Sequence, residues 1–128
     1  EFFHVGIGPH DGTHHGASTL YGGRRNYPIK TMGTIMREMG VNKLDMVRMD
    51  VEGAEWDVLQ GWIESGILKS VDQLLLEIHM DRALPERYAS ILSKLGQTME
   101  PFWAAKNNFS PGNIYSNLSP VHELGFLN

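Results

Sequence analysis

The spacing of hydrophobic residues along the chain predicts three helices. Apolar residues recur every three or four positions between residues 29 and 39, and Gly40 ends the run. This spacing is the period of one buried helix face, so we expect a helix over residues 30–39. The same pattern predicts helices over residues 55–64 and 85–95, with Gly66 and Gly96 placed to end them.

Between and around these helices lie short apolar runs that are typical of strands. We expect strands over residues 2–8, 44–51, 72–80, 99–105 and 121–127. The unbroken leucines within residues 72–80 indicate a strand that is buried on both faces, as in a parallel sheet. Strands that alternate with helices predict an α/β fold with right-handed crossovers, and the last two strands are close enough to form an antiparallel hairpin. The Gly- and His-rich residues 9–28 are interpreted as a long loop.

Composition narrows the class of protein without identifying it. The 128 residues are 41% hydrophobic and 20% charged, which suits one folded domain. The net charge of -4 gives no broad basic surface for nucleic acid or for an anionic membrane. The absence of cysteine excludes disulfides, thiolate metal sites and cysteine nucleophiles, but it leaves the compartment open. No apolar run approaches the ~20 residues that span a bilayer.

Two carboxylates stand where the strand of residues 44–51 meets the following helix. Asp50 and Glu52 close the strand, and Gly53 allows a tight turn. Ligands of open α/β sheets bind outside the carboxyl ends of the strands, so this pair could bind a cationic group, hold a metal ion or accept a proton. Alternatively, Glu52 caps the helix and Asp50 hydrogen-bonds loop amides. The residue types alone leave both interpretations open.

Charged residues also interrupt two of the apolar strands. Alternation places Arg48 on the same strand face as Asp50, and Glu77 on the same face as His79. If the two strands are parallel neighbours, one register sets Arg48 against Glu77 and brings Asp50 near His79. The first pair would be a buried ion pair that supports the site, because unpaired charges are costly to bury. The second would be an acid–imidazole pair suited to general base catalysis, with a purely structural histidine as the alternative.

A histidine-rich segment offers a second candidate site. His10, Asp11, His14 and His15 could ligate zinc or a similar ion. Their spacing fits no closed site, however, and adjacent histidines seldom point at one ion. A solvated loop is therefore the favoured interpretation.

At this point the chain resembles a known family. Residues 48–55 (RMDVEGAE) with Val58 and Leu59, followed by residues 75–79 (LLEIH), are similar to the signature of FkbM-type S-adenosylmethionine-dependent methyltransferases. Residues 122–128 (HELGFLN) resemble the closing pattern of the animal methyltransferase-like variant of that family. Family members usually carry lysine where this chain has Arg48, which is a conservative difference. The resemblance covers most of the chain from Phe2 onward.

The resemblance implies the Rossmann-like class I methyltransferase sheet, which is mostly parallel with an antiparallel C-terminal hairpin. On that template, residues 2–8 match the third strand, residues 44–51 the fourth and residues 72–80 the fifth. The implied cofactor is S-adenosylmethionine. Gly6, Ile7 and Gly8 would line its adenine side, and Asp50 and Glu52 would lie near its methionyl end and the methyl acceptor.

The resemblance also implies that the N-terminal strands of the fold are missing. The glycine-rich first strand of the family, and the acidic residue that ends its second strand, should precede Phe2, and the chain opens without methionine. We therefore expect residues 1–128 to be a single domain that forms the carboxyl-terminal portion of a methyltransferase domain. Alone, it should bind the cofactor weakly and be inactive.

The main functional hypothesis is methyl transfer from S-adenosylmethionine to an oxygen or nitrogen acceptor, a displacement helped mainly by proximity and orientation. Asp50 or His79 would deprotonate or orient the acceptor, Glu52 would position the acceptor or the cofactor, and Glu77 would support the site through Arg48. This hypothesis includes no metal ion. One alternative is a metal-assisted enzyme that uses Asp50, Glu52 and His79, and another is a non-catalytic interaction domain of the same fold.

Overall fold

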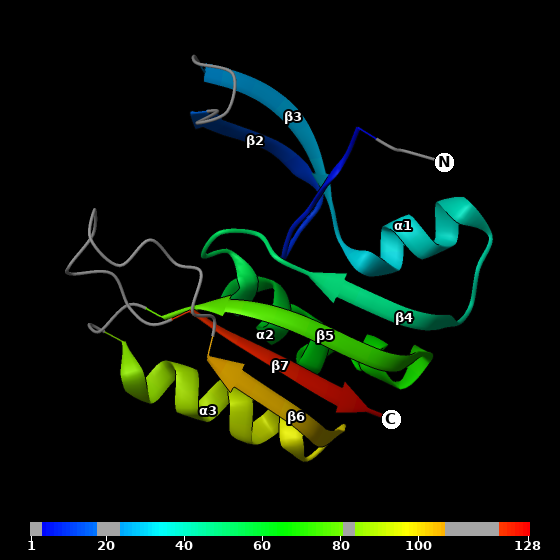
Figure 1. The fold of residues 1–128 in the computed structure, drawn as a ribbon. Coiled ribbons are helices and arrows are strands. Elements are labelled where there is room, and N and C mark those ends of the chain that lie inside the picture. Colours follow the sequence, from blue (N-terminus) through cyan, green and yellow to red (C-terminus); the bar gives the residue numbers. More distant parts are fainter. Residues whose placement is uncertain (1–3, 18–23, 81–83, 107–120) are drawn as a thin grey trace.

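The computed structural model describes residues 4–17, 24–80, 84–106 and 121–128, which form a mixed α/β fold with two sheets (Figure 1). In chain order the elements are β1 (Gly6–Ile7), β2 (Gly12–Ala17), β3 (Arg24–Lys30), α1 (Met32–Met39), β4 (Leu44–Met49), α2 (Glu55–Ser65), the 3-10 helix η1 (Ile67–Ser70), β5 (Val71–His79), α3 (Pro85–Gly96), β6 (Glu100–Lys106) and β7 (Val121–Leu127). The three predicted helices are confirmed, with ends that differ by at most two residues. The helices could be predicted because apolar residues recur at the helical period and because glycine or proline stands at their ends.

The larger sheet, called here the main sheet, contains β4, β5, β7 and β6 side by side in that order. β4 runs parallel to β5, whereas β7 lies between β5 and β6 and is antiparallel to both. The predicted C-terminal hairpin is therefore confirmed. The mostly parallel sheet is not confirmed, because within the described residues β1–β3 and β4–β5 are the parallel pairs and the other pairings are antiparallel. β2–β3 and β6–β7 pair as hairpins, and hairpin partners run antiparallel.

The second sheet, called here the hairpin sheet, overturns the interpretation of residues 9–28 as a loop. β2 and β3 pair antiparallel, from Gly12 opposite Ile29 to Ala17 opposite Arg24, and β1 adds parallel to β3. A Cβ atom placed on Gly6 or Gly8 would lie 3.1 or 3.0 Å from the Ile29 side chain. The small size of these glycines therefore lets β3 pack closely against β1.

One face of the main sheet is buried under α2 and α3. Leu74, Leu76 and Ile78 alternate along β5, and they pack in one core with Leu59 of α2 and Leu95 of α3. This core fixes the carboxyl ends of β4 and β5 relative to the start of α2. No helix within the described residues is long and apolar enough to cross a membrane.

The other face of the main sheet is much more open. Met46 and Trp103 keep 54% and 44% of their surface exposed, and a hollow of about 310 Å³ is lined by Arg48, Leu75, Glu77 and Trp103, among others. Arg48 is itself exposed, and its partner across the β4–β5 pairing is Leu75. The predicted burial of Arg48 against Glu77 is therefore wrong, since α2 and α3 pack on the opposite side.

Candidate functional site

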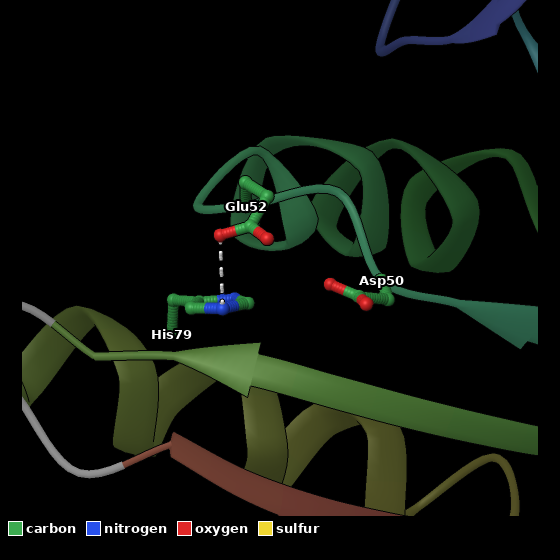
Figure 2. A group of neighbouring side chains, drawn as sticks. All are labelled: Asp50, Glu52 and His79. Carbon is green, nitrogen blue, oxygen red and sulfur yellow. Dashed lines mark ion pairs between the residues drawn. The ribbon is translucent and has the colours of Figure 1, made fainter. Parts of the chain in front are cut away.

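The carboxyl ends of β4 and β5 lie at one edge of the main sheet and bring three predicted site residues together (Figure 2). Asp50 and Glu52 follow β4, and His79 is the last residue of β5. One carboxylate oxygen of each acid and one ring nitrogen of His79 all lie within 4.8 Å of one another. Asp50, Glu52 and His79 are called here the carboxylate–histidine cluster. Their common location agrees with the sequence prediction, while their roles remain predictions.

The turn after β4 holds Glu52 in an unusual backbone conformation. Glu52 has a φ of 52°, in the left-handed region that a residue with a side chain rarely adopts, and Gly53 follows with a φ of 105°. This conformation brings the Glu52 carboxylate over the ring of His79 (Figure 2), with Oε2 at 3.4 Å from Nε2. The Glu52 side chain is 84% exposed. Residues held in such conformations cluster at functional sites, which makes Glu52 a candidate for a functional role.

A fully buried carboxylate, that of Glu55, supports this turn from behind. Its oxygens accept hydrogen bonds from the backbone N–H of Val51 at 3.0 Å and of Gly53 at 2.9 and 3.1 Å. Its Oε1 also lies 3.0 Å from Nδ1 of His79. The sequence predicts no such role for Glu55, because an apolar pattern gives no sign of a buried acid.

The contact with Glu55 determines which nitrogen of His79 faces the open side. Because the Glu55 carboxylate is the acceptor for the backbone N–H groups, we assign the ring hydrogen of His79 to Nδ1, which then donates to Oε1 of Glu55. Nε2 is then the nitrogen that faces Glu52. The indole Nε1 of Trp56 donates to the carbonyl oxygen of His79 at 2.7 Å and fixes the end of β5. The imidazole is therefore oriented, with Nε2 available for a proton or a ligand.

The register of β4 and β5 differs from the predicted one by two residues. Arg48 pairs with Leu75 instead of Glu77, and Met49 pairs with Leu76. The ion pair of His79 on the open side therefore involves Glu52 rather than Asp50. A shift of two residues keeps every side chain on its predicted face, which is why the cluster still forms.

The predicted cofactor contacts at Gly6, Ile7 and Gly8 lie in a different part of the molecule. Gly6 and Ile7 form β1 of the hairpin sheet, and the buried Gly8 borders a cavity of about 170 Å³ lined also by residues of α1 and α2. Close packing against Ile29 explains on structural grounds why Gly6 and Gly8 have no side chain. Their contact with a cofactor remains a prediction.

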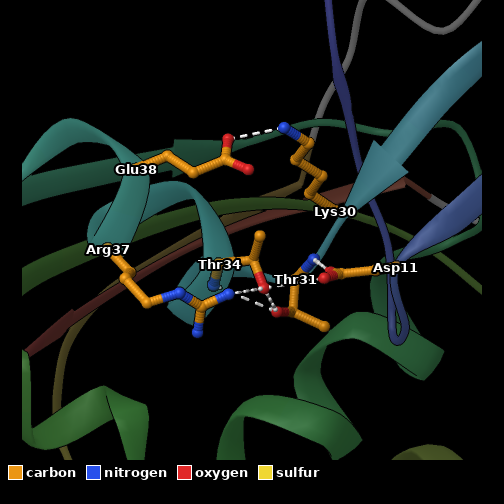
Figure 3. A network of polar contacts seen from close by, with 6 residues as sticks. All are labelled: Asp11, Lys30, Thr31, Thr34, Arg37 and Glu38. Atoms are coloured by element: carbon orange, nitrogen blue, oxygen red, sulfur yellow. Dashed lines mark hydrogen bonds and ion pairs between the residues drawn. The ribbon is translucent and has the colours of Figure 1, made fainter.

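The histidine-rich segment has a structural arrangement of its own. Asp11 caps α1, because its Oδ1 accepts from the N–H of Thr31 at 2.7 Å and its Oδ2 accepts from the hydroxyl of Thr34 at 2.8 Å (Figure 3). His14 contacts the Tyr27 ring, and Nδ1 of His15 lies 2.8 Å from Oδ1 of Asn26. These contacts tie the hairpin sheet together and to α1. Among the residues described, the carboxylate–histidine cluster is the group with the donors and spacing to hold a metal ion.

The fold and the site define an α/β protein whose candidate chemistry lies at the carboxyl edge of adjacent parallel strands. The chain belongs to the methyltransferase FkbM domain family, whose model matches residues 3–99. The match extends from the hairpin sheet through the carboxylate–histidine cluster to the end of α3. It confirms the resemblance found in the segment from Arg48 to Glu55.

Comparison with individual proteins gives matches over shorter segments of the chain. The chain is 39% identical over 51 residues to "Probable methyltransferase-like protein 24" of Homo sapiens and of Rattus norvegicus, covering 40% of this chain and 14% of each relative. It is 33% identical over 54 residues to "AMB antimetabolite synthetase AmbE" of Pseudomonas aeruginosa, covering 42% of this chain and 2% of that protein. The chain thus spans a small part of the relatives it matches. No solved structure matches it.

Proposed function

We propose that this protein transfers a methyl group from S-adenosylmethionine to an oxygen or nitrogen acceptor held at the carboxylate–histidine cluster. The observation that carries the proposal is the orientation of His79 by the buried Glu55, which directs Nε2 toward the exposed carboxylates. Membership of the methyltransferase FkbM domain family supports the reaction class. The position of the cluster, at the carboxyl edge of two parallel strands, is where α/β folds bind ligands.

The residues of the cluster fit the charge of the proposed cofactor. S-adenosylmethionine carries an ammonium and a sulfonium group, and both Asp50 and Glu52 present exposed carboxylates at the strand edge. Asp50 would hold the methionyl end, and Gly6, Ile7 and Gly8 are the proposed contacts on the adenine side. When bound, the cofactor supplies an electrophilic methyl carbon attached to a positively charged sulfur.

The chain's own residues would position the acceptor and take up its proton. The cofactor would supply the methyl group and keep the electron pair of the broken bond on its sulfur, so the chain's own residues would have to handle only the acceptor and its proton. The proton of the acceptor passes to Nε2 of His79, whose positive charge the Glu55 carboxylate stabilises through Nδ1. Glu52, 3.4 Å from Nε2, and Asp50 would orient the acceptor. Glu77, on the same face of β5 as His79, is kept as a support, although Arg48 is exposed and not buried against it.

The test uses the full-length gene product. S-adenosylmethionine binding is measured by calorimetry, and labelled methyl transfer is then measured to a panel of hydroxyl- and amino-bearing small molecules. We expect Asp50→Ala and His79→Gln to lower the transfer rate by about 100-fold or more, since a positioned acid or base contributes on that order. The matched control is Asp45→Asn, which changes an exposed carboxylate of β4 far from the strand end.

The outcomes separate the proposal from its alternatives. Wild-type rates in Asp50→Ala would remove Asp50 from the catalytic set. If the full-length gene product does not bind S-adenosylmethionine, the proposal is overturned and a non-catalytic interaction domain is favoured.

A further inference from the structure

We propose that the carboxylate–histidine cluster is a binding site for a divalent transition-metal cation. Nε2 of His79 and one oxygen each of Asp50 and Glu52 would be its protein ligands, and all three atoms already lie within 4.8 Å of one another (Figure 2). The inference concerns ion binding in the absence of the cofactor. An ion on Nε2 of His79 would occupy the nitrogen that takes up the acceptor's proton in the proposed methyl transfer, so the two uses of the cluster exclude each other.

The spacing of Glu52 and His79 suits two ligands of one ion. Their facing atoms are 3.4 Å apart, which is longer than the 2.7–2.9 Å usual for a charge-assisted hydrogen bond. Two ligands of a tetrahedral ion with bonds of about 2.1 Å lie about 3.4 Å apart. The separation is therefore that of two ligands of one ion, and the Glu52 side chain, which is 84% exposed and lies over the ring in Figure 2, would move toward the ring plane to reach an ion bound to Nε2. Asp50 is exposed and can close the remaining distance by a change of rotamer.

A second observation comes from outside the three ligands. Histidines that bind metals usually donate their other ring N–H to a carboxylate or carbonyl, which fixes the tautomer and the ring orientation. Nδ1 of His79 has such a contact with Glu55, at 3.0 Å, and Glu55 is fully buried and anchored by the N–H groups of Val51 and Gly53. Glu55 thus orients the His79 ring so that Nε2 faces the open side, as the hydrogen-bond partner of a metal-binding histidine does.

The donor set selects the class of ion. Imidazole nitrogen suits zinc, iron and similar ions, whereas magnesium and calcium prefer oxygen ligands alone. Two carboxylates with one imidazole therefore favour Mn²⁺ or Zn²⁺ over Mg²⁺. Three protein ligands leave at least one coordination position for water or for an oxygen atom of a small molecule.

The experiment titrates the full-length gene product with Mn²⁺ and follows the free ion by electron paramagnetic resonance, with Zn²⁺ and Mg²⁺ as competitors. We expect one Mn²⁺ site that Zn²⁺ displaces more readily than Mg²⁺ does. Asp50→Asn, Glu52→Gln and His79→Gln should each weaken that site at least tenfold, while the matched control Asp45→Asn should bind as the wild type does. Circular dichroism checks that each variant is folded.

A second measurement does not depend on the variants. In the wild-type protein, bound Mn²⁺ should broaden the NMR signals of the His79 ring at lower concentrations than those of His14, which lies on the hairpin sheet. Failure of the wild type to bind Mn²⁺, unchanged binding in the cluster variants, or broadening of His14 first would each overturn the site. Competition by Mg²⁺ as strong as that by Zn²⁺ would overturn the assignment to transition metals.

Discussion

Two strand-to-helix junctions of this molecule satisfy the backbone N–H groups near the helix start in different ways. Where β3 leads into α1, Thr31 is the N-cap, and its hydroxyl accepts from the N–H of Thr34 at 3.2 Å. Asp11, from the turn before β2, satisfies the N–H of Thr31 as well (Figure 3). Where β4 leads into α2, the N-cap residue is Ala54, which has no side chain to cap the helix, and Glu55 folds back into the turn instead.

The difference separates stabilising groups from groups available for binding. At the first junction the short polar side chains that face the helix start are engaged with each other. At the second junction one buried acid, Glu55, satisfies the backbone of the turn, which leaves the carboxylates of Asp50 and Glu52 exposed. At such a junction the exposed acids can be substituted without loss of the hydrogen bonds that Glu55 makes to the turn. The comparison therefore predicts large stability effects at Glu55 and small ones at Glu52.

The largest expected effect is that of Glu55→Ala. The substitution removes the acceptor of the N–H groups of Val51 and Gly53 and of Nδ1 of His79, which are partly exposed donors around a fully buried carboxylate. Hydrogen bonds to a charged group are worth about 1.5–3 kcal/mol, and the partial exposure of the donors places the expected cost at about 2 kcal/mol. We expect the free energy of unfolding, measured by urea denaturation, to fall by about that amount. The matched control is Glu64→Ala, which removes an exposed acid of the same helix that contacts Gln60.

A fall at Glu55 no larger than that of the Glu64 control would contradict the division of roles. It would mean that water or another group satisfies the turn when the buried carboxylate is removed.

A smaller effect on the free energy of unfolding is expected at Glu52. There glycine should be more stabilising than alanine, which is the opposite of what is expected within a helix. The left-handed conformation costs a residue with a side chain about 1 kcal/mol or slightly more, and glycine avoids this cost. Glu52→Gly should therefore be more stable than Glu52→Ala by about 1 kcal/mol in the same urea experiment. Ala89→Gly, within α3, is the control, because there glycine should destabilise the protein by about 1 kcal/mol. Both Glu52 variants should lose the proposed cation site equally, and equal stability of the two would argue against strain at this position.

Much of the fold could be predicted because its signals are local. The helices follow from the spacing of apolar residues, and Pro85 at the first position of α3 is consistent with a helix start. The β2–β3 hairpin was missed because Gly12–Ala17 (GTHHGA) has no alternation of apolar and polar residues. Its strand conformation depends on pairing with β3, which no local pattern of β2 encodes.

The candidate site was predictable in its location but not in its pairings. Strand ends and side-chain alternation were enough to place Asp50, Glu52 and His79 at one edge. The faces of β4 and β5 follow from the apolar pattern, but registers that differ by two residues share the same faces. The sequence therefore could not distinguish Leu75 from Glu77 as the partner of Arg48, and nothing in it revealed that Glu55 would be buried.

The smallest effect expected is the pH dependence contributed by the first junction. The N–H of Thr31 and, less strongly, the hydroxyl of Thr34 donate to the Asp11 carboxylate and lower its pKa below the usual value of 3.8. Because the folded-state pKa is the lower one, the ionised carboxylate contributes its stability above pH 3.8, and the contribution is lost as the pH falls through the folded-state pKa. Asp11→Asn keeps an oxygen acceptor for Thr31 but cannot ionise, so its unfolding free energy should change less steeply with pH in this acidic range. Thr34→Val should move the pKa of Asp11, measured by NMR titration, back toward 3.8, and an unchanged pKa would show that the hydroxyl contributes nothing to the cap.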